Sequence, residues 1–255
     1  MNVLRSIVVA FAMYSRIPMP KVEWTPQAMA YAIALFPLVG LVEGFVSIAF
    51  GLVALQLGLP EPLLVVGLAL LPGAVNGGIH LDGLADTSDA LASHAPRERK
   101  LEILKDSNIG AFGAIALASH LLVLVAVYAS MDVRPAVLAA LPSIFVLSRV
   151  CSAWAVVCWP QARAQGSVRT FSDGAAATPS CVVLVVLGLA AAVPLVLLQQ
   201  LVGVLVLAGL ALAVAQYRFT AMRNFGGVTG DLAGWFLQNA ELYMLIALVV
   251  GGVWL

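Results

Sequence analysis

The sequence predicts an all-α fold, a polytopic helical bundle embedded in a membrane. Of its 255 residues, 62% are hydrophobic and only 10% are charged, whereas soluble domains are about 45–50% apolar and about 25% charged. A soluble core of this length needs a charged surface that 13 acidic and 13 basic residues cannot form. The apolar residues also gather into runs of the length that crosses a bilayer, about 20 residues. The net charge is zero and no basic patch stands out, so nucleic acid is not expected as a partner.

The first element, residues 2–14, is mildly apolar, is interrupted by Arg5 and lacks a small-residue cleavage site after it. We therefore expect a helix at the membrane interface rather than a secretory signal. About seven transmembrane helices follow, at residues 37–58, 62–80, 111–130, 135–159, 181–198, 201–217 and 235–255. Proline at a first helical position and polar or glycine-rich breaks mark these boundaries, as at Pro37, Pro62, Pro135, Gln199-Gln200 and Gly226-Gly227.

Basic residues set the predicted orientation, because cytoplasmic loops collect Lys and Arg. With a cytoplasmic N-terminus, all of them except Arg134 and Arg149 fall on the cytoplasmic side: Arg5, Arg16, Lys21, Arg97, Arg99, Lys100, Lys105, Arg163, Arg169, Arg218 and Arg223. Most acidic residues fall on the same side. We expect one membrane domain over residues 1–255, with its polar chemistry facing the cytoplasm and the lipid bilayer around it.

The densest polar motif follows the second span, where Asp82, Asp86 and Asp89 recur at i, i+4 and i+7. On a helix they share one face, and carboxylates this close repel one another unless a cation or protons intervene. Mg²⁺ takes oxygen ligands and commonly rests on one or two carboxylates plus substrate phosphates. The alternative is a solvated helix whose acids stay hydrated. Leu81 and Leu84 between the acids favour partial burial and hence a site.

Two further motifs face the same compartment. Lys105-Asp106-Ser107-Asn108-Ile109-Gly110 leads into the third span, where free N–H groups at a helix start favour a phosphate. Gly226-Gly227-Val228-Thr229-Gly230-Asp231 precedes the last span, where it suits a phosphate cradle or part of a metal shell. Each motif alone also fits an ordinary helix entry or turn. Neither of the nucleotide-binding patterns GxxxxGK[ST] and GxGxxG occurs in the sequence.

Glu43, Arg149 and Glu241 lie inside predicted spans, where a charge must face protein or a hydrated cavity. Arg149 either reaches a phosphate from the cytoplasmic side or pairs with a glutamate. For the glutamates we expect the pair. His120, also inside a span, is expected to be a hydrogen-bonded packing residue rather than a ligand.

Taken together, the motifs His80-Leu81-Asp82-Gly83-Leu84-Ala85-Asp86-Thr87, 104–113 and 226–231 resemble the cobalamin synthase family, adenosylcobinamide-GDP ribazoletransferase. The resemblance extends over essentially the whole chain, through Ser15-Arg16-Ile17-Pro18, 36–40, Ser148-Arg149 and Ala162-Arg163. Two positions depart from the family pattern. Asn108 stands where a basic residue is expected, and Leu232-Ala233-Gly234 follows the last motif.

The resemblance implies a Mg²⁺-dependent enzyme of the bacterial inner membrane, active in the assembly of the nucleotide loop of vitamin B12. It would join adenosylcobinamide-GDP to α-ribazole or its 5′-phosphate and release GMP. Its catalytic residues would be Asp82, Asp86, Asp106 and His80, and its metal ligands Asp82, Asp86, Asp89 and Asp231. Its substrate-binding residues would be Arg16, Lys105, Ser107, Gly110, Arg149, Arg163, Thr229 and Gly230. For the general base, Asp106 or a metal-bridging aspartate precedes His80.

Three other functions fit the sequence less well. A CDP-alcohol phosphotransferase carries a pattern like Asp-x-x-Asp-Gly-x-x-Ala-Arg, whereas here Asp82 directly precedes Gly83 and no Ala-Arg follows. A secondary transporter places its substrate near the midplane between repeats, whereas these motifs sit at one face. A purely structural protein needs no such motifs. The sequence leaves open the ribazole form, the number of metal ions and whether a homo-oligomer forms.

Overall fold

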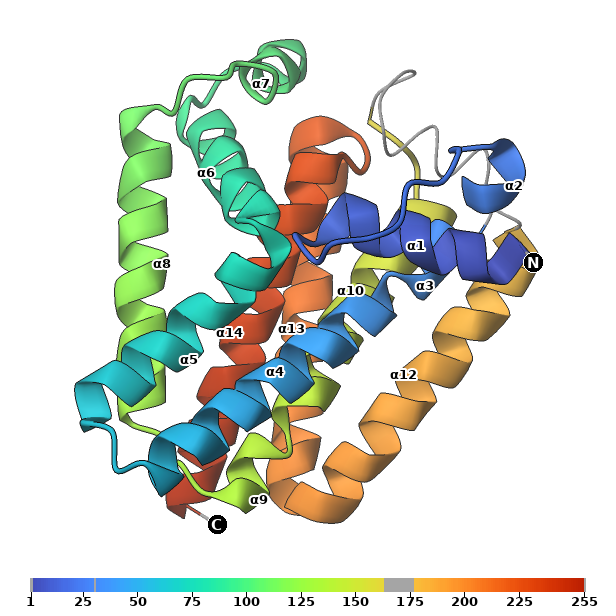
Figure 1. Ribbon diagram of the computed structural model, residues 1–255. Coiled ribbons are helices and arrows are strands. Elements are labelled where there is room, and N and C mark those ends of the chain that lie inside the picture. Colours follow the sequence, from blue (N-terminus) through green and yellow to red (C-terminus); the bar gives the residue numbers. More distant parts are fainter. Residues whose placement is uncertain (1, 30, 163–176, 255) are drawn as a thin grey trace.

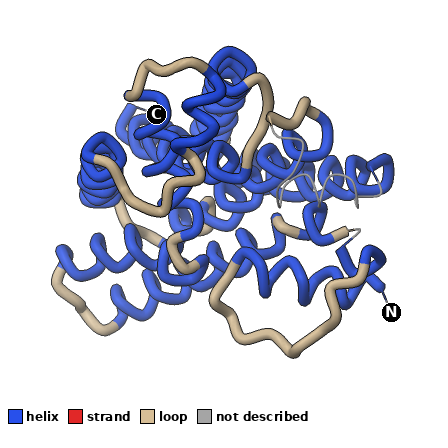
Figure 2. Tube along the Cα trace, turned by 90° about the horizontal axis from the view of Figure 1, so that it is seen from above, coloured by secondary structure: helices blue, strands red, loops and turns tan. Residues whose placement is uncertain are grey.

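The computed structural model describes residues 2–29, 31–162 and 177–254, and within these ranges the chain is helical without a β-strand (Figures 1 and 2). The helices are α1 (Asn2–Tyr14), α2 (Pro26–Met29), α3 (Ala32–Leu35), α4 (Pro37–Gln56), α5 (Glu61–Asn76), α6 (Ile79–Ala92), α7 (Arg97–Ile103), α8 (Ala111–Ala129), α9 (Pro135–Leu138), α10 (Leu141–Cys158), α12 (Ala177–Gln199), α13 (Leu201–Thr220), the π-helix η1 (Ala221–Phe225) and α14 (Gly230–Trp254). The predicted all-α class is confirmed.

Among the described residues, 6 helical stretches are long and apolar enough to cross a membrane. They are Ala32–Gln56, Ala111–Ala129, Pro135–Cys158, Thr178–Gln199, Leu201–Phe225 and Gly230–Val253. The bent pair α5 and α6 supplies a further crossing if both helices form one span. The predicted multi-pass bundle is therefore confirmed, and the helix limits fall within a few residues of most of the predicted spans.

The prediction of one continuous helix over residues 62–80 is wrong. The helix ends at Asn76, and α6 leaves at 93° to α5. Gly77 and Gly78 make this turn with φ of 72° and 81°, a left-handed conformation that favours glycine. The Asn76 side chain accepts a hydrogen bond from the Gly78 N–H at 2.9 Å. His80 and the three aspartates therefore lie on a separate helix that starts inside the bundle.

Helix α14 packs against α6, α10 and α13 and so lies at the centre of the bundle. Its crossing with α6 is close because glycines face each other: a Cβ at Gly83 would lie 2.6 Å from the Asp231 carbonyl oxygen and 3.2 Å from Gly234 Cα. Small residues at such contacts let helix backbones approach. This crossing brings the aspartate motif on α6 next to the motif 226–231 at the start of α14.

Helix α1 occupies the predicted residues 2–14 and runs crosswise to the long helices (Figure 1). Its last residue, Tyr14, packs its ring against Phe36 at 4.2 Å between ring centroids. That contact holds the end of α1 over the start of α4, next to the end of the bundle where α6, α7 and the start of α14 meet.

Candidate active site at one end of the bundle

The α6–α14 crossing brings the aspartates of two distant motifs together. Asp86 is half-buried on α6, and four other aspartates lie near enough for their negative charges to act on it: Asp82, Asp231, Asp89 and Asp106. In the part of the chain that the structure describes, neither Asp82 nor Asp86 forms a salt bridge. The aspartates therefore lie close together in the folded chain and concentrate negative charge at one end of the bundle.

These carboxylates do not by themselves form a finished metal cage. Among the described residues, no group of three His, Cys, Asp or Glu side chains is arranged to hold a metal ion. A hard cation such as Mg²⁺ needs fewer, because water and substrate phosphate oxygens complete its octahedral shell. The donor set Asp82, Asp86 and Asp231 has the oxygen chemistry that such a cation prefers.

Asp89 makes a contact that the sequence did not predict. Its two carboxylate oxygens accept hydrogen bonds from the backbone N–H groups of Gly110 and Gly113, each at 2.8 Å. These are free donors at the start of α8, and a carboxylate there is further stabilised by the helix dipole. Asp89 thus caps α8 from α6. The same bond occupies the Gly110 N–H, which is therefore not free for the phosphate contact predicted for it.

The loop before α8 reaches the acidic end of the bundle as predicted. Lys105, Asp106 and Ser107 are all exposed on it. The backbone N–H of Asn108 and then its side-chain amide donate to Asp106 Oδ1, at 3.0 and 2.9 Å, and hold the pKa of that carboxyl below its usual value. Asp106 is therefore an ionised carboxylate and a weak proton acceptor, which disfavours it as general base.

The third motif begins α14. The buried Thr229 hydroxyl accepts a hydrogen bond from the Leu232 N–H at 3.2 Å and caps the start of α14. Gly230 is exposed at the helix start. The segment is held in place by Val228, whose N–H donates to the Pro160 carbonyl at 2.8 Å and whose carbonyl accepts from the Ala162 N–H at 3.0 Å.

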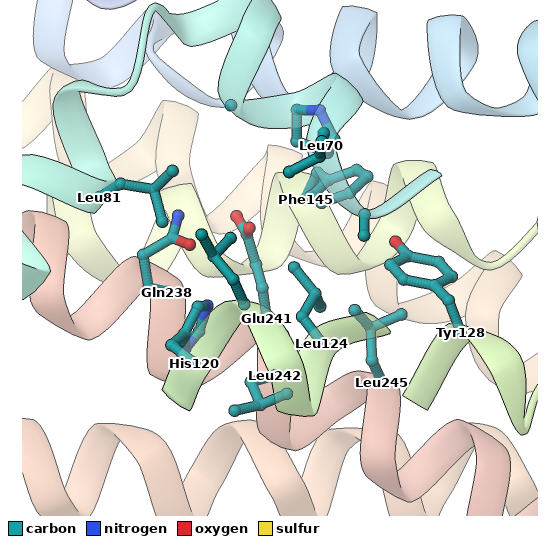
Figure 3. Close-up of a pocket in the computed structure, with 14 residues that line it drawn as sticks. Leu70, Leu81, His120, Leu124, Tyr128, Phe145, Gln238, Glu241, Leu242 and Leu245 are labelled. Atoms are coloured by element: carbon teal, nitrogen blue, oxygen red, sulfur yellow. The ribbon is translucent and has the colours of Figure 1, made fainter. Parts of the chain in front are cut away.

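Arg149 does not reach the aspartates. Its side chain is fully buried, and its guanidinium donates to Glu43 Oε2 at 2.5 Å and to Glu241 Oε1 at 2.7 Å. The structure thus replaces the predicted phosphate contact with the ion pair that we expected for the glutamates. A cavity of about 40 Å³ adjoins this cluster, and Figure 3 shows Glu241, Gln238 and His120 gathered in it. His120 is buried beside Gln238, in keeping with the packing role expected of it.

A larger cavity, about 170 Å³, opens beside the aspartates, and His80, Asp82, Gly230 and Asp231 all line it. His80 is 4% exposed, and its Nε2 atom has no hydrogen-bond partner among the described residues. Arg16 lies nearby on the surface, with its side chain over Gly77, and its backbone N–H donates to the Val75 carbonyl at 2.8 Å. Arg163 lies outside the described residues.

Comparison with known proteins identifies the family. Residues 6–249 match the family model described as cobalamin-5-phosphate synthase. The chain belongs to the cobalamin-5-phosphate synthase family.

Relatives in this family match nearly the full length of the chain. A protein of Lachnoclostridium phytofermentans named adenosylcobinamide-GDP ribazoletransferase is 35% identical over 250 residues, 98% of this chain and 95% of its own. A protein of the same name from Escherichia coli is 34% identical over 242 residues, 92% of this chain and 95% of its own. No solved structure matches the chain.

In this member of the cobalamin-5-phosphate synthase family, two basic residues near the site, Arg97 and Lys100, were not predicted as site residues from the sequence. The Arg97 guanidinium occupies the space that a side chain at Gly226 would need. Lys100, which is 9% exposed, donates to Asn224 Oδ1 at 2.8 Å. Both residues lie on α7, three positions apart, so a helical reading of residues 97–103 predicts that they share a face. They bring positive charge to the glycine turn before α14.

Proposed function

We propose that the chain is an adenosylcobinamide-GDP ribazoletransferase. It transfers the cobinamide phosphate of adenosylcobinamide-GDP to α-ribazole or its 5′-phosphate and releases GMP. The observation that carries the proposal is the meeting of Asp82 and Asp86 on α6 with Asp231 on α14, beside a cavity and a basic helix. The names of the relatives describe a reaction on a pyrophosphate, for which such a site is suited.

In this reaction a ribose hydroxyl of ribazole attacks the phosphorus nearest cobinamide. A phosphorus–oxygen bond forms to the ribose, the bond to the bridging oxygen breaks, and GMP leaves with that oxygen. Phosphoryl transfer of this kind depends on alignment and on neutralising the phosphate oxygens rather than on covalent chemistry by the protein. The residues that matter are therefore those that hold cations, align the hydroxyl and accept its proton.

We assign Asp82, Asp86 and Asp231 as the residues that would hold Mg²⁺, and we leave Asp89 out because α8 engages both of its oxygens. When bound there, Mg²⁺ would offset pyrophosphate charge and polarise its oxygens. The excess of carboxylates around Asp86, without a salt bridge to Asp82 or Asp86 in the described chain, supports a bound cation.

The remaining roles fall to other residues around the cavity. A carboxylate oxygen of Asp82 accepts the hydroxyl proton, because Asp82 lines the cavity whereas Asp106 is exposed and a weak base. Arg97 at the glycine turn and Lys105 on the exposed loop offset negative charge on the donor. Ser107 and Arg16 are exposed near this end and are assigned to substrate binding.

We place the site on the cytoplasmic side of a bacterial inner membrane. The distribution of Lys and Arg between the spans supports this orientation. The substrates are charged and polar, so an opening toward the aqueous phase that holds them is required. Labelling of single cysteines introduced at Lys105 and at Asp132, with a reagent that cannot cross membranes, tests the orientation: in intact cells only the Asp132 position should react.

The decisive experiment uses the purified full chain with adenosylcobinamide-GDP, α-ribazole 5′-phosphate and Mg²⁺. GMP and a corrinoid carrying the lower base should appear together, and removal of Mg²⁺ by a chelator should stop both. Asp82→Asn should lower GMP release by about 100-fold or more. The exposed Glu98→Gln on α7 serves as the matched control and should leave the rate unchanged.

Two results would overturn the proposal. One is the absence of GMP from the wild-type chain that has bound substrate, and the other is release of CMP from CDP-diacylglycerol. Near-normal GMP release by Asp82→Asn at saturating Mg²⁺ would remove only the assignment of Asp82.

A further inference from the structure

Two thiols from different helices meet at the end of α10. The Sγ atoms of Cys158, the last residue of α10, and Cys181, near the start of α12, lie 3.5 Å apart. The two residues are 23 positions apart in the chain, so the packing of α10 against α12 makes this contact. Both cysteines are free thiols, and neither lines the cavity of the proposed active site.

Both thiols lie at the ends of candidate spans. Cys158 is the last residue of Pro135–Cys158, and Cys181 is close to the start of Thr178–Gln199. Trp159 follows Cys158 directly, and tryptophan is enriched where a span meets the membrane–water interface. Cys158 is exposed and Cys181 is half-buried. Small water-soluble reagents therefore reach the pair without crossing the hydrocarbon.

The two sulfur atoms are placed for a bond to form between them. A disulfide has about 2.05 Å between its sulfurs, so Cys158 Sγ and Cys181 Sγ need to approach by roughly 1.5 Å. Rotation about the Cα–Cβ bonds moves the sulfurs without moving the helices. Because the fold already holds the two thiols in contact, closure of the bond is an intramolecular step with a high effective concentration.

We propose that Cys158 and Cys181 are a redox-active dithiol, which a low-molecular-weight disulfide oxidises reversibly to a disulfide. The thiolate of the exposed Cys158 attacks one sulfur of the reagent, and the first small thiol leaves. The Cys181 thiolate then attacks Cys158 Sγ, so that the S–S bond forms and the second small thiol leaves. The chain loses two S–H bonds, and its two electrons and two protons end on the two released thiols.

The bond ties α12 to a segment that reaches the motif before α14. Pro160 and Ala162, which follow Cys158 closely, hold Val228 through backbone hydrogen bonds of 2.8 and 3.0 Å. In the orientation proposed above, the pair faces the cytoplasm, where thiols are kept reduced and disulfides are transient. The dithiol is therefore the resting form, and the disulfide is the form that oxidation produces.

The third cysteine of the chain provides an internal control. Cys151 lies on α10 two turns before Cys158 and is half-buried. Among the described residues, no other thiol lies within hydrogen-bond distance of it. Oxidation that depends on the contact between α10 and α12 leaves Cys151 as a thiol, whereas indiscriminate oxidation does not.

The test treats the purified full chain in detergent with oxidised glutathione, blocks the remaining thiols with iodoacetamide and digests the unfolded chain with trypsin without a reductant. Trypsin cleaves after Arg163 and Arg169, between the two cysteines. A disulfide therefore keeps the peptides 150–163 and 170–218 together in the mass spectrum. We expect this linked pair, with one alkylated cysteine in it, and its separation by dithiothreitol.

Single substitutions identify the bonded residues. Cys151→Ala should give the same linked pair, whereas Cys158→Ala and Cys181→Ala should give none. Alkylation of all three cysteines in oxidised wild-type chain would overturn the proposal, as would a linked pair that persists in Cys158→Ala or a bond between two chains. The decisive measurement uses the wild-type chain, so it does not depend on how a variant folds. It also does not use GMP release, so the proposed function and the dithiol are tested separately.

Discussion

Asp89 and Asp82 lie on one helix two turns apart, yet the structure gives them separate roles. Asp89 accepts two backbone N–H groups of α8, whereas Asp82 lines the cavity. The carboxylate at Asp89 ties α6 to α8, and α8 is continuous with the loop that carries Lys105 and Asp106. The position of that loop therefore depends on the contact between Asp89 and the start of α8.

We predict that Asp89→Asn lowers the stability of the folded protein without changing the Mg²⁺ concentration that the reaction needs. The amide nitrogen of asparagine cannot accept the second hydrogen bond, and the donor left unpaired costs about 1–3 kcal/mol. The loss should appear as a lower melting temperature in detergent. The Mg²⁺ concentration that gives half-maximal GMP release should stay at the wild-type value.

Asp82→Asn is the comparison, because it should raise that Mg²⁺ concentration. If Asp89→Asn raises it to the same extent, Asp89 is a metal ligand after all and its contacts with α8 are secondary.

For single residues, the sequence predicts which side chains share a helix face better than it predicts which partner each side chain contacts. The i, i+4, i+7 spacing of Asp82, Asp86 and Asp89 places them on one face of a helix, and the structure has them on one helix. Which carboxylate meets the N-terminus of α8 depends on how two helices pack, and spacing within one helix does not encode that. The same holds for Arg149, whose sequence neighbours do not reveal that both glutamates surround it.

At the level of elements, the site depends on the distance between α6 and α14. Gly83 on α6 faces the backbone of Asp231 and Gly234, so these helices touch without side chains between them. Any wedge here moves Asp82 and Asp86 away from Asp231. The crossing is thus part of the proposed catalytic geometry as well as of the packing.

We predict that Gly83→Ala is both less stable and less active. A Cβ at Gly83 would lie 2.6 Å from the Asp231 carbonyl oxygen, which forces the backbones apart. Overpacking of this kind costs about 1–3 kcal/mol, and a displacement of about 1 Å between catalytic groups costs up to about 100-fold in rate. Melting temperature and GMP release measure the two effects.

Gly252→Ala is the control, because a Cβ at that position of α14 meets nothing within 4 Å. It should leave both measurements unchanged. Equal losses of stability and GMP release in the two variants would show that the close α6–α14 crossing has no special role.

The limits of the helices could be predicted wherever the length of an apolar run determines them. A span needs a local run of apolar residues, so most limits agree with the structure, for example α8 at Ala111–Ala129 against the predicted 111–130. The turn at Gly77 and Gly78 was missed because a glycine pair inside an apolar run also fits close helix packing. Only the left-handed backbone angles distinguish the two cases.

At the scale of the whole molecule, Arg149 joins three helices that are far apart in the sequence. It lies on α10 and binds Glu43 of α4 and Glu241 of α14. All three side chains are buried, so each charge depends on the others. A buried pair contributes little relative to an apolar replacement, but the loss of one partner is strongly destabilising.

We predict that Arg149→Met destabilises the folded protein by about 3–5 kcal/mol, because it leaves two buried carboxylates unpaired. Thermal unfolding in detergent checks this. Arg134→Met is the control: its salt bridge to Asp132 is exposed, and such pairs contribute about 0–1 kcal/mol. Adding Glu43→Gln and Glu241→Gln to Arg149→Met should restore part of the stability. If it does not, the defect comes from lost packing rather than from unpaired charge.

The triad of Glu43, Arg149 and Glu241 also imposes an order on biogenesis. Glu43 leaves the ribosome more than 100 residues ahead of Arg149, and Glu241 follows about 90 residues later. A lone carboxylate is costly in hydrocarbon, and Glu43 on α4 has no counter-charge in the triad until α10 is present. Arrival of α10 supplies the counter-charge, and only α14, the last helix, completes the set. The complete triad of Glu43, Arg149 and Glu241 therefore cannot form before α14 has been synthesised, and a nascent chain that ends before Glu241 leaves Arg149 one carboxylate short.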